Sequence, residues 1–118
     1  MLEDENIVRF FDCMSQRKDG QLEHLLSDSA EFYFPKTRPL LGKDRILTFF
    51  KFLWRQYPEL TFEIQRVILQ EQTAAVHWTN RGTNRKGEPY ENEGVTLLEI
   101  KDNKIVYISD FFKDTGLF

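Results

Sequence analysis

A single carboxylate stands in residues 105–112, a segment near the end of the sequence that is otherwise mostly hydrophobic. Asp110 has Ile108 and Phe112 as neighbours at two-residue spacing. Residues two apart share one face of a β-strand, so these three side chains are expected to point the same way. If that face borders an apolar cavity, desolvation raises the pKa of the carboxyl group, which suits a general acid or base. The alternative is that Asp110 lies at the cavity mouth and bonds to a tyrosine, an arginine or water.

His77 is the second candidate catalytic residue, because the usual pKa of histidine is near neutrality. If the odd-numbered residues of its strand face the interior, His77 can partner Asp110 across the sheet. If the even-numbered residues face the interior, His77 lies in solvent or in a subunit interface. The apolar side chains of Ala74, Val76 and Trp78 favour the second orientation.

Other ligand and nucleophile patterns are missing from the sequence. His24 and His77 are far apart, and Cys13 is the only cysteine, so no metal-ligand spacing arises. There is no phosphate-binding glycine loop and no Ser–His–Asp pattern. We therefore expect no metal and no cofactor.

Composition and charge exclude several classes of partner. The formal net charge of −3 argues against a nucleic-acid-binding protein, which needs a basic face. No apolar run approaches the roughly 18–20 residues that span a bilayer. The first residues are acidic where a signal peptide would be basic, and a single cysteine permits no internal disulfide. These features predict a cytoplasmic protein with no nucleic-acid or membrane partner.

The spacing of apolar residues divides the sequence into a helical first half and a β-rich second half. Helical spacing predicts helices over residues 4–16, 20–27 and 43–57. Alternation predicts strands over residues 30–34, 60–70, 73–82, 90–100 and 104–112. Asp102 and Asn103 predict a tight turn, since both tolerate a positive φ. This order predicts an α+β fold in which one domain, residues 1–118, packs three helices on one face of an antiparallel sheet.

The late strands are apolar on both faces. In residues 104–112, one face is expected to carry Val106, Ile108 and Phe112, and the other to carry Ile105, Tyr107 and Phe111. A sheet with one wet face would instead alternate polar and apolar residues. Three helices cover one face only, so we expect a homodimer formed through the outer sheet face.

Four segments carry a resemblance to a known family. They read DSAEF at residues 28–32, GKDRI at 42–46, GVTLLEIKDNKI at 94–105 and SDFFKD at 109–114. With the order of the elements, they resemble the SnoaL-like group of the nuclear-transport-factor-2-like superfamily over nearly the whole chain. The resemblance implies a sheet curved into a cone-like half-barrel with an internal apolar pocket. It leaves the reaction open, because this fold hosts isomerases, cyclases, epoxide hydrolases and transport factors.

The resemblance also implies which residues meet a ligand. In epoxide-hydrolase and SnoaL-like cyclase relatives, the aspartate that matches Asp110 belongs to the catalytic set. The first helix, the long helix and the concave sheet face would line the pocket. The expected ligand-binding residues are therefore Phe10, Met14, Tyr33, Phe34, Trp54, Trp78, Thr96 and Phe112.

Two mechanisms of the relatives do not fit this sequence. The catalytic base of the steroid isomerases matches Phe34, or Tyr33 if the alignment shifts by one, and neither is a carboxylate. Their two oxyanion donors match Phe10, which lacks a hydroxyl, and Thr96, which is not an acid. The epoxide hydrolases need an Arg-x-Asp pair in the strand at residues 73–82, and this strand has none.

We therefore expect a homodimer that binds a small, mostly apolar molecule, with Asp110 as its key polar group. If the protein is an enzyme, we expect metal-free proton transfer on a carbonyl-containing substrate, of the isomerase, cyclase or hydrolase type. The alternative is a non-catalytic ligand-binding or protein-interaction module of the same fold. An open cavity with Asp110 in its wall favours the first function, and a cone filled by side chains favours the second.

Overall fold

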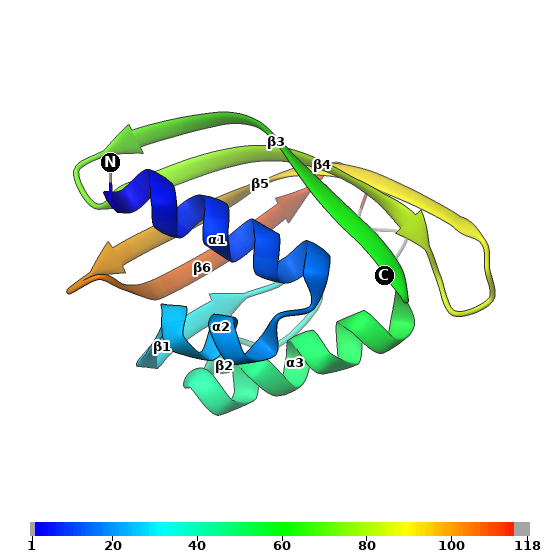
Figure 1. The fold of residues 1–118 in the computed structure, drawn as a ribbon, viewed down its shortest axis with the longest axis horizontal. Coiled ribbons are helices and arrows are strands. Elements are labelled where there is room, and N and C mark those ends of the chain that lie inside the picture. Colours follow the sequence, from blue (N-terminus) through cyan, green and yellow to red (C-terminus); the bar gives the residue numbers. More distant parts are fainter. Residues whose placement is uncertain (1, 115–118) are drawn as a thin grey trace.

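Three helices lie along one side of a curved six-stranded sheet in a computed structural model of the protein, which describes residues 2–114 (Figure 1). The helices are α1 (Leu2–Gln16), α2 (Asp19–Leu25) and α3 (Lys43–Gln56). The strands are β1 (Leu26–Tyr33), β2 (Leu40–Leu41), β3 (Glu59–Gln70), β4 (Thr73–Thr83), β5 (Pro89–Lys101) and β6 (Lys104–Phe112). The predicted α+β architecture is confirmed.

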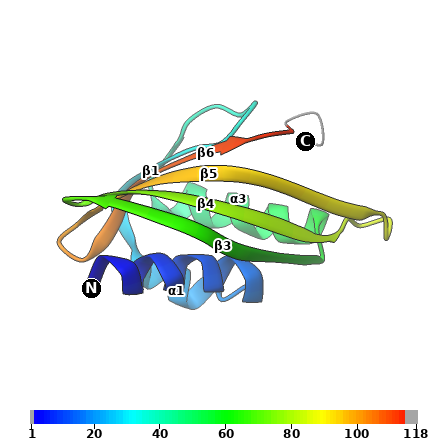
Figure 2. The same cartoon turned by 90° about the horizontal axis from the view of Figure 1, so that it is seen from above.

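The strands run in the order β2-β1-β6-β5-β4-β3 across the sheet. All neighbouring strands are antiparallel except β1 and β6, which are parallel although they lie far apart in the sequence. The sheet curves over the helices and its two edges, β2 and β3, do not meet (Figure 2). It is therefore an open, curved sheet rather than a closed barrel.

The helices turn their apolar stripes toward the concave face of the sheet. Ile7, Phe10, Phe11 and Met14 of α1 are at most 4% exposed, and α1 packs against β3. Ile46, Phe50, Leu53 and Trp54 are the buried residues of α3, which packs against β1. Aromatic edge contacts join the two helices, since the rings of Phe10 and Phe50 lie 6.2 Å apart. The core is thus a layer of rings between helices and sheet.

The first strand begins earlier than predicted. Helix α2 ends at Leu25, and β1 starts at Leu26, whereas the sequence predicts a helix to residue 27 and a strand from residue 30. Leu26 already pairs with Ile105 of β6, so pairing between distant segments overrides the local helical pattern. The two-residue strand β2 is also absent from the sequence prediction.

A β-bulge changes the faces of the last strand. Val106 is an extra residue between Ile105, which pairs with Ile100, and Tyr107, which pairs with Glu99. The expectation that Ile105 shares a face with Tyr107 and Phe111 is therefore wrong, and Ile105 is buried together with Ile108. Beyond the bulge the predicted alternation holds, so that Phe111 is 56% exposed on the outer face.

Two further findings concern residues 2–114 alone. None of the helices in this range is both long and apolar enough to cross a bilayer. The same residues contain no group of three or more histidine, cysteine or acidic side chains placed to hold a metal ion.

Candidate functional site

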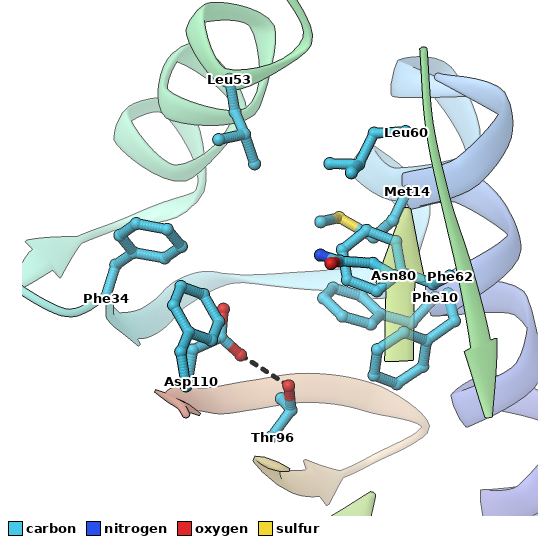
Figure 3. Close-up of a pocket in the computed structure, with 11 residues that line it drawn as sticks. Phe10, Met14, Phe34, Leu53, Leu60, Phe62, Asn80, Thr96 and Asp110 are labelled. Atoms are coloured by element: carbon cyan, nitrogen blue, oxygen red, sulfur yellow. Dashed lines mark hydrogen bonds between the residues drawn. The ribbon is translucent and has the colours of Figure 1, made fainter. Parts of the chain in front are cut away.

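A small cavity lies between the helices and the concave face of the sheet. Its volume is about 20 Å³, which is room for about one water molecule. Phe34 and Leu53 face Phe10, Met14 and Asn80 across this space, and Asp110 lies beneath it (Figure 3). The complete lining is Phe10, Phe11, Met14, Phe34, Leu53, Leu60, Phe62, Asn80, Thr96, Asp110 and Phe112.

Asp110 reaches the cavity from β6, as strand alternation predicts. Its direct partner in the sheet register is Thr96 of β5, whose hydroxyl donates a hydrogen bond of 2.6 Å to Asp110 Oδ1. Burial raises the pKa of Asp110 to about 7, and the hydrogen bond from Thr96 opposes that rise. A carboxyl group with this pKa is present in both protonation states at neutral pH.

Trp78 supports Thr96 from the next strand. Its indole N–H donates a hydrogen bond of 2.8 Å to Thr96 Oγ1. Trp78 and Thr96 are each 1% exposed, so bulk water cannot replace either bond. Trp78 is not among the residues that line the cavity, but it contacts Thr96, which is.

Asn80 adds a polar group that sequence reasoning misses. It is 6% exposed and lines the cavity from β4. Within the described part of the chain its Oδ1 atom has no hydrogen-bond partner. A buried acceptor without a partner costs free energy that a bound donor can recover. The signal that could have identified Asn80 is its position two residues after Trp78, because strand alternation places both on one face.

His77 lies on the opposite face of the sheet from Asp110. Its Nε2 atom contacts Glu93 Oε2, and Lys113 Nζ lies 2.9 Å from Glu93 Oε1. Hydrogen bonds from Lys113 and His77 lower the pKa of Glu93. Of the two orientations considered for β4, the structure shows the one in which Val76, Trp78 and Asn80 face inward. It does not bring His77 together with Asp110.

The structure brings together most, but not all, of the predicted ligand-binding residues. Phe10, Met14, Phe34, Thr96 and Phe112 line the cavity with Asp110.

Three of the predicted residues do not line the cavity. One is Trp78, which contacts Thr96 instead. The other two are Tyr33 and Trp54. Tyr33 points to the outer face, where its hydroxyl donates to Glu31 and its ring lies 5.4 Å from that of Tyr107. Trp54 is buried beside α1, where its indole N–H donates to the carbonyl oxygen of Met14.

Four apolar residues that line the cavity are absent from the sequence prediction. Phe11 and Leu53 belong to the helical stripes that pack on the sheet, and Leu60 and Phe62 belong to β3. The alternation of Leu60 and Phe62 could have identified these two, because β3 is the strand against which α1 packs.

An open groove adjoins the cavity at one end of α3. Its volume is about 440 Å³, and its walls include Lys36, Phe52 and Tyr57. Phe34 and Leu53 line both the groove and the cavity. These two side chains therefore separate the cavity from the groove.

Comparison with known proteins agrees with this architecture. A family model described as SnoaL-like domain matches residues 7–108. Among solved structures, an NTF2-like protein of unknown function from Burkholderia pseudomallei K96243 superposes with a TM-score of 0.90 and 15% identity, covering 99% of this chain and 94% of the other. A search of curated proteins finds no match.

Two further solved structures carry a functional description. TerC co-crystallised with polyporic acid has a TM-score of 0.89 and 18% identity, covering 100% of this chain and 95% of the other. An LEH-like epoxide hydrolase from M. tuberculosis has a TM-score of 0.84 and 12% identity, covering 95% and 83% of the two chains. At these identities the similarity establishes the fold alone.

Proposed function

Because this chain belongs to the SnoaL-like domain family, we propose that it binds a small, mostly apolar molecule beside Asp110 and exchanges a proton with it. The observation that carries this proposal is a carboxyl group with a pKa of about 7 in the wall of an apolar cavity. That pKa is close to the optimum for a general acid or base at neutral pH. The co-crystallisation of the related fold TerC with polyporic acid supports a small-molecule ligand.

The cavity must widen to admit such a molecule, since its volume is about 20 Å³. Phe34 and Leu53 stand between it and the groove of about 440 Å³. Rotation of these two side chains would join the two spaces, with Asp110 at the inner end. The ligand is then a molecule with an apolar body and a polar group that enters first.

The polar group of the ligand can be inferred from the two polar residues at the inner end. Asp110 in its protonated form donates to a carbonyl oxygen, and in its charged form it removes a proton from a neighbouring carbon. The unpartnered Oδ1 of Asn80 accepts a hydrogen bond from a hydroxyl or enol. A carbonyl compound that forms an enol satisfies both residues.

The test uses an apolar ketone, 2-tetralone, and follows incorporation of deuterium from D₂O next to its carbonyl. We expect exchange with the wild-type protein and loss of exchange in Asp110→Asn. Asp28→Asn is the matched control, because the Asp28 side chain is fully exposed. Equal exchange rates in the wild type and Asp110→Asn would overturn the catalytic assignment. Native mass spectrometry of the purified protein tests separately for a co-purified ligand.

A non-catalytic interaction module is the second candidate, and the small volume of the cavity favours it. Under this hypothesis the aromatic side chains that line the cavity serve only to pack the core. Phe34→Ala distinguishes the two functions, because it joins the cavity to the groove. The binding hypothesis expects tighter 2-tetralone binding to Phe34→Ala by calorimetry, whereas a packing role expects only lower stability and no binding.

We also propose that the protein is a homodimer through the outer sheet face. Ile68 is 59% exposed and Phe111 is 56% exposed on this face. Large exposed apolar side chains on one sheet surface are typical of subunit contacts. Light scattering is expected to give a dimer mass for the wild type and a monomer mass for Phe111→Asp. Phe52→Asp changes a ring on α3 that is 49% exposed, and this variant is expected to remain dimeric.

A further inference from the structure

Two hydrogen bonds link Trp78, Thr96 and Asp110, and the chemistry of the three side chains determines which atom donates in each. An indole N–H can only donate, so Thr96 Oγ1 must accept the 2.8 Å bond from Trp78. The single proton of the Thr96 hydroxyl is then available for Asp110 Oδ1, at 2.6 Å. Because Trp78 and Thr96 are almost completely buried, no solvent molecule competes for these bonds.

This direction holds in both protonation states of the carboxyl group. If Asp110 carried its proton on Oδ1, that proton would have to be donated to Thr96. The Thr96 hydroxyl would then lose its acceptor inside the protein, which is costly for a buried group. Oδ1 therefore remains an acceptor, and the proton is carried by Oδ2.

We propose that Thr96 and Trp78 are positioning residues, which hold the exchangeable proton of Asp110 on Oδ2. Figure 3 shows Oδ2 directed away from Thr96, toward the space that Phe34 and Asn80 border. The proposal deepens the proposed function, on which it rests for the claim that Oδ2 meets the ligand. The location of the proton is a property of the ligand-free protein.

Within the described part of the chain, Asp110 is the only ionisable side chain that lines the cavity. Among the described residues, α1, α3, β3 and the segment at Phe34 contribute only apolar side chains to the cavity. The contributions of β4 and β5 are the uncharged Asn80 and Thr96. The pKa of Asp110 accordingly responds to burial and to the Thr96 hydrogen bond.

The test measures the Asp110 carboxyl group in the absence of any ligand. Carbon-13 NMR of labelled aspartate, assigned with Asp110→Asn, gives its pKa. Thr96→Val removes a hydrogen bond that favours the charged form of Asp110. We therefore expect the pKa of Asp110 to rise, with the affinity of the carboxyl group for its proton increasing about tenfold or more. Thr96→Ser restores the hydroxyl and is expected to restore the pKa. Trp78→Phe is expected to give an intermediate value, because the Thr96 hydroxyl loses the bond that orients it.

Infrared spectroscopy locates the proton directly. When the proton is on Oδ2, the carbonyl oxygen of the acid is Oδ1, and its hydrogen bond to Thr96 lowers the C=O stretching frequency. Thr96→Val should therefore shift this band upward at pH 5, and Thr96→Ser should not. Ser109→Ala is the matched control, since Ser109 is buried on the opposite face of β6 and should leave both readings unchanged.

Two results would overturn the proposal. One is an unchanged pKa and stretching frequency in Thr96→Val. The other is equal shifts in Thr96→Val and Thr96→Ser. If Thr96→Val fails to fold, Thr96→Ala provides the same comparison with a smaller side chain. Because no measurement involves 2-tetralone, these outcomes are independent of whether Asp110 turns over a substrate.

Discussion

Asp110 and Glu93 show how the face of a sheet sets the chemistry of a carboxyl group. Asp110 points into the cavity, where burial raises its pKa to about 7. Glu93 lies on the outer face, where hydrogen bonds from Lys113 and His77 lower its pKa. The first residue is suited to proton exchange, and the second is suited to a stable ion pair.

The raised pKa of Asp110 predicts a stability that depends on pH. Its usual value is 3.8, so from about pH 4 to about pH 7 the folded protein holds a proton that the unfolded chain releases. Stability from this group is therefore full below about pH 4 and is lost progressively as the pH rises from about 4 through 7. Urea unfolding measures this effect. The free energy of unfolding of Asp110→Asn, relative to that of the wild type, should rise by up to about 3 kcal/mol between pH 5 and pH 8. A constant difference between the two proteins at all pH values would contradict the prediction.

The only thiol of the sequence is predicted to be unreactive in the folded protein. Cys13 is fully buried, and burial, with a smaller contribution from Asp12, raises the pKa of its thiol. The thiolate is the reactive form, so the disulfide reagent DTNB should label Cys13 only on unfolding. Ser29→Cys adds an exposed thiol and should react at once, with one equivalent of reagent. Rapid labelling of the native wild type would exclude the buried position.

At the scale of elements, the register between neighbouring strands determines which side chains meet at the candidate site. Trp78 of β4 lies opposite Gly94 of β5, and Thr96 of β5 lies opposite Asp110 of β6. The glycine leaves room for the indole ring, because a Cβ at Gly94 would lie 2.8 Å from an atom of Trp78. The same Cβ would lie 2.3 Å from the carbonyl oxygen of Phe111. Gly94 is therefore a structural requirement for Trp78 to reach Thr96.

Replacement of Gly94 should destabilise the sheet. Gly94→Ala forces a backbone oxygen and the indole ring of Trp78 to move, which we expect to cost roughly 1–3 kcal/mol. Gly20→Ala is the matched control, because nothing lies within 4 Å of a Cβ at Gly20 in α2. It should be neutral or stabilising by up to about 1 kcal/mol, since alanine is the better helix former. Urea unfolding measures both, and equal stability of the two variants would disprove the steric argument.

Strand alternation made much of the site predictable. It placed Asp110 and Phe112 on one face, and the apolar side chains beside His77 favoured the outward orientation of that residue. The bulge at Val106 could not be predicted, because it depends on how β6 matches β5 rather than on the residues of β6 alone. The same holds for Leu26, whose strand conformation comes from a partner far away in the sequence. The role of Trp78 needed coordinates, since it acts through Thr96.

At the scale of the whole molecule, the sheet has a well-paired centre and weak edges. β4, β5 and β6 each have partner strands on both sides, whereas β2 is a two-residue edge strand and β3 forms the other edge. Asp110 and Thr96 belong to the central strands. The candidate site is thus attached to the part of the fold that is expected to open least often.

Amide hydrogen exchange should follow this order. Amides of β5 and β6 are expected to exchange slowest, and those of β2 and the outward amides of β3 to exchange fastest. The physical reason is that an edge amide loses protection by local fraying, whereas a central amide needs opening of several strands. Exchange in β2 as slow as that in β5 would contradict this order.

The parallel pairing of β1 with β6 has a consequence for synthesis on the ribosome. On the ribosome, β1 is synthesised long before β6. Until β6 has been made, the edge of β1 that includes Phe32 has no partner strand. During that interval the exposed apolar edge is a natural target for a chaperone. Strand β6, which carries Asp110, is the last strand of the sheet to be synthesised, so the pairing of Thr96 with Asp110 cannot form until every other strand has been made.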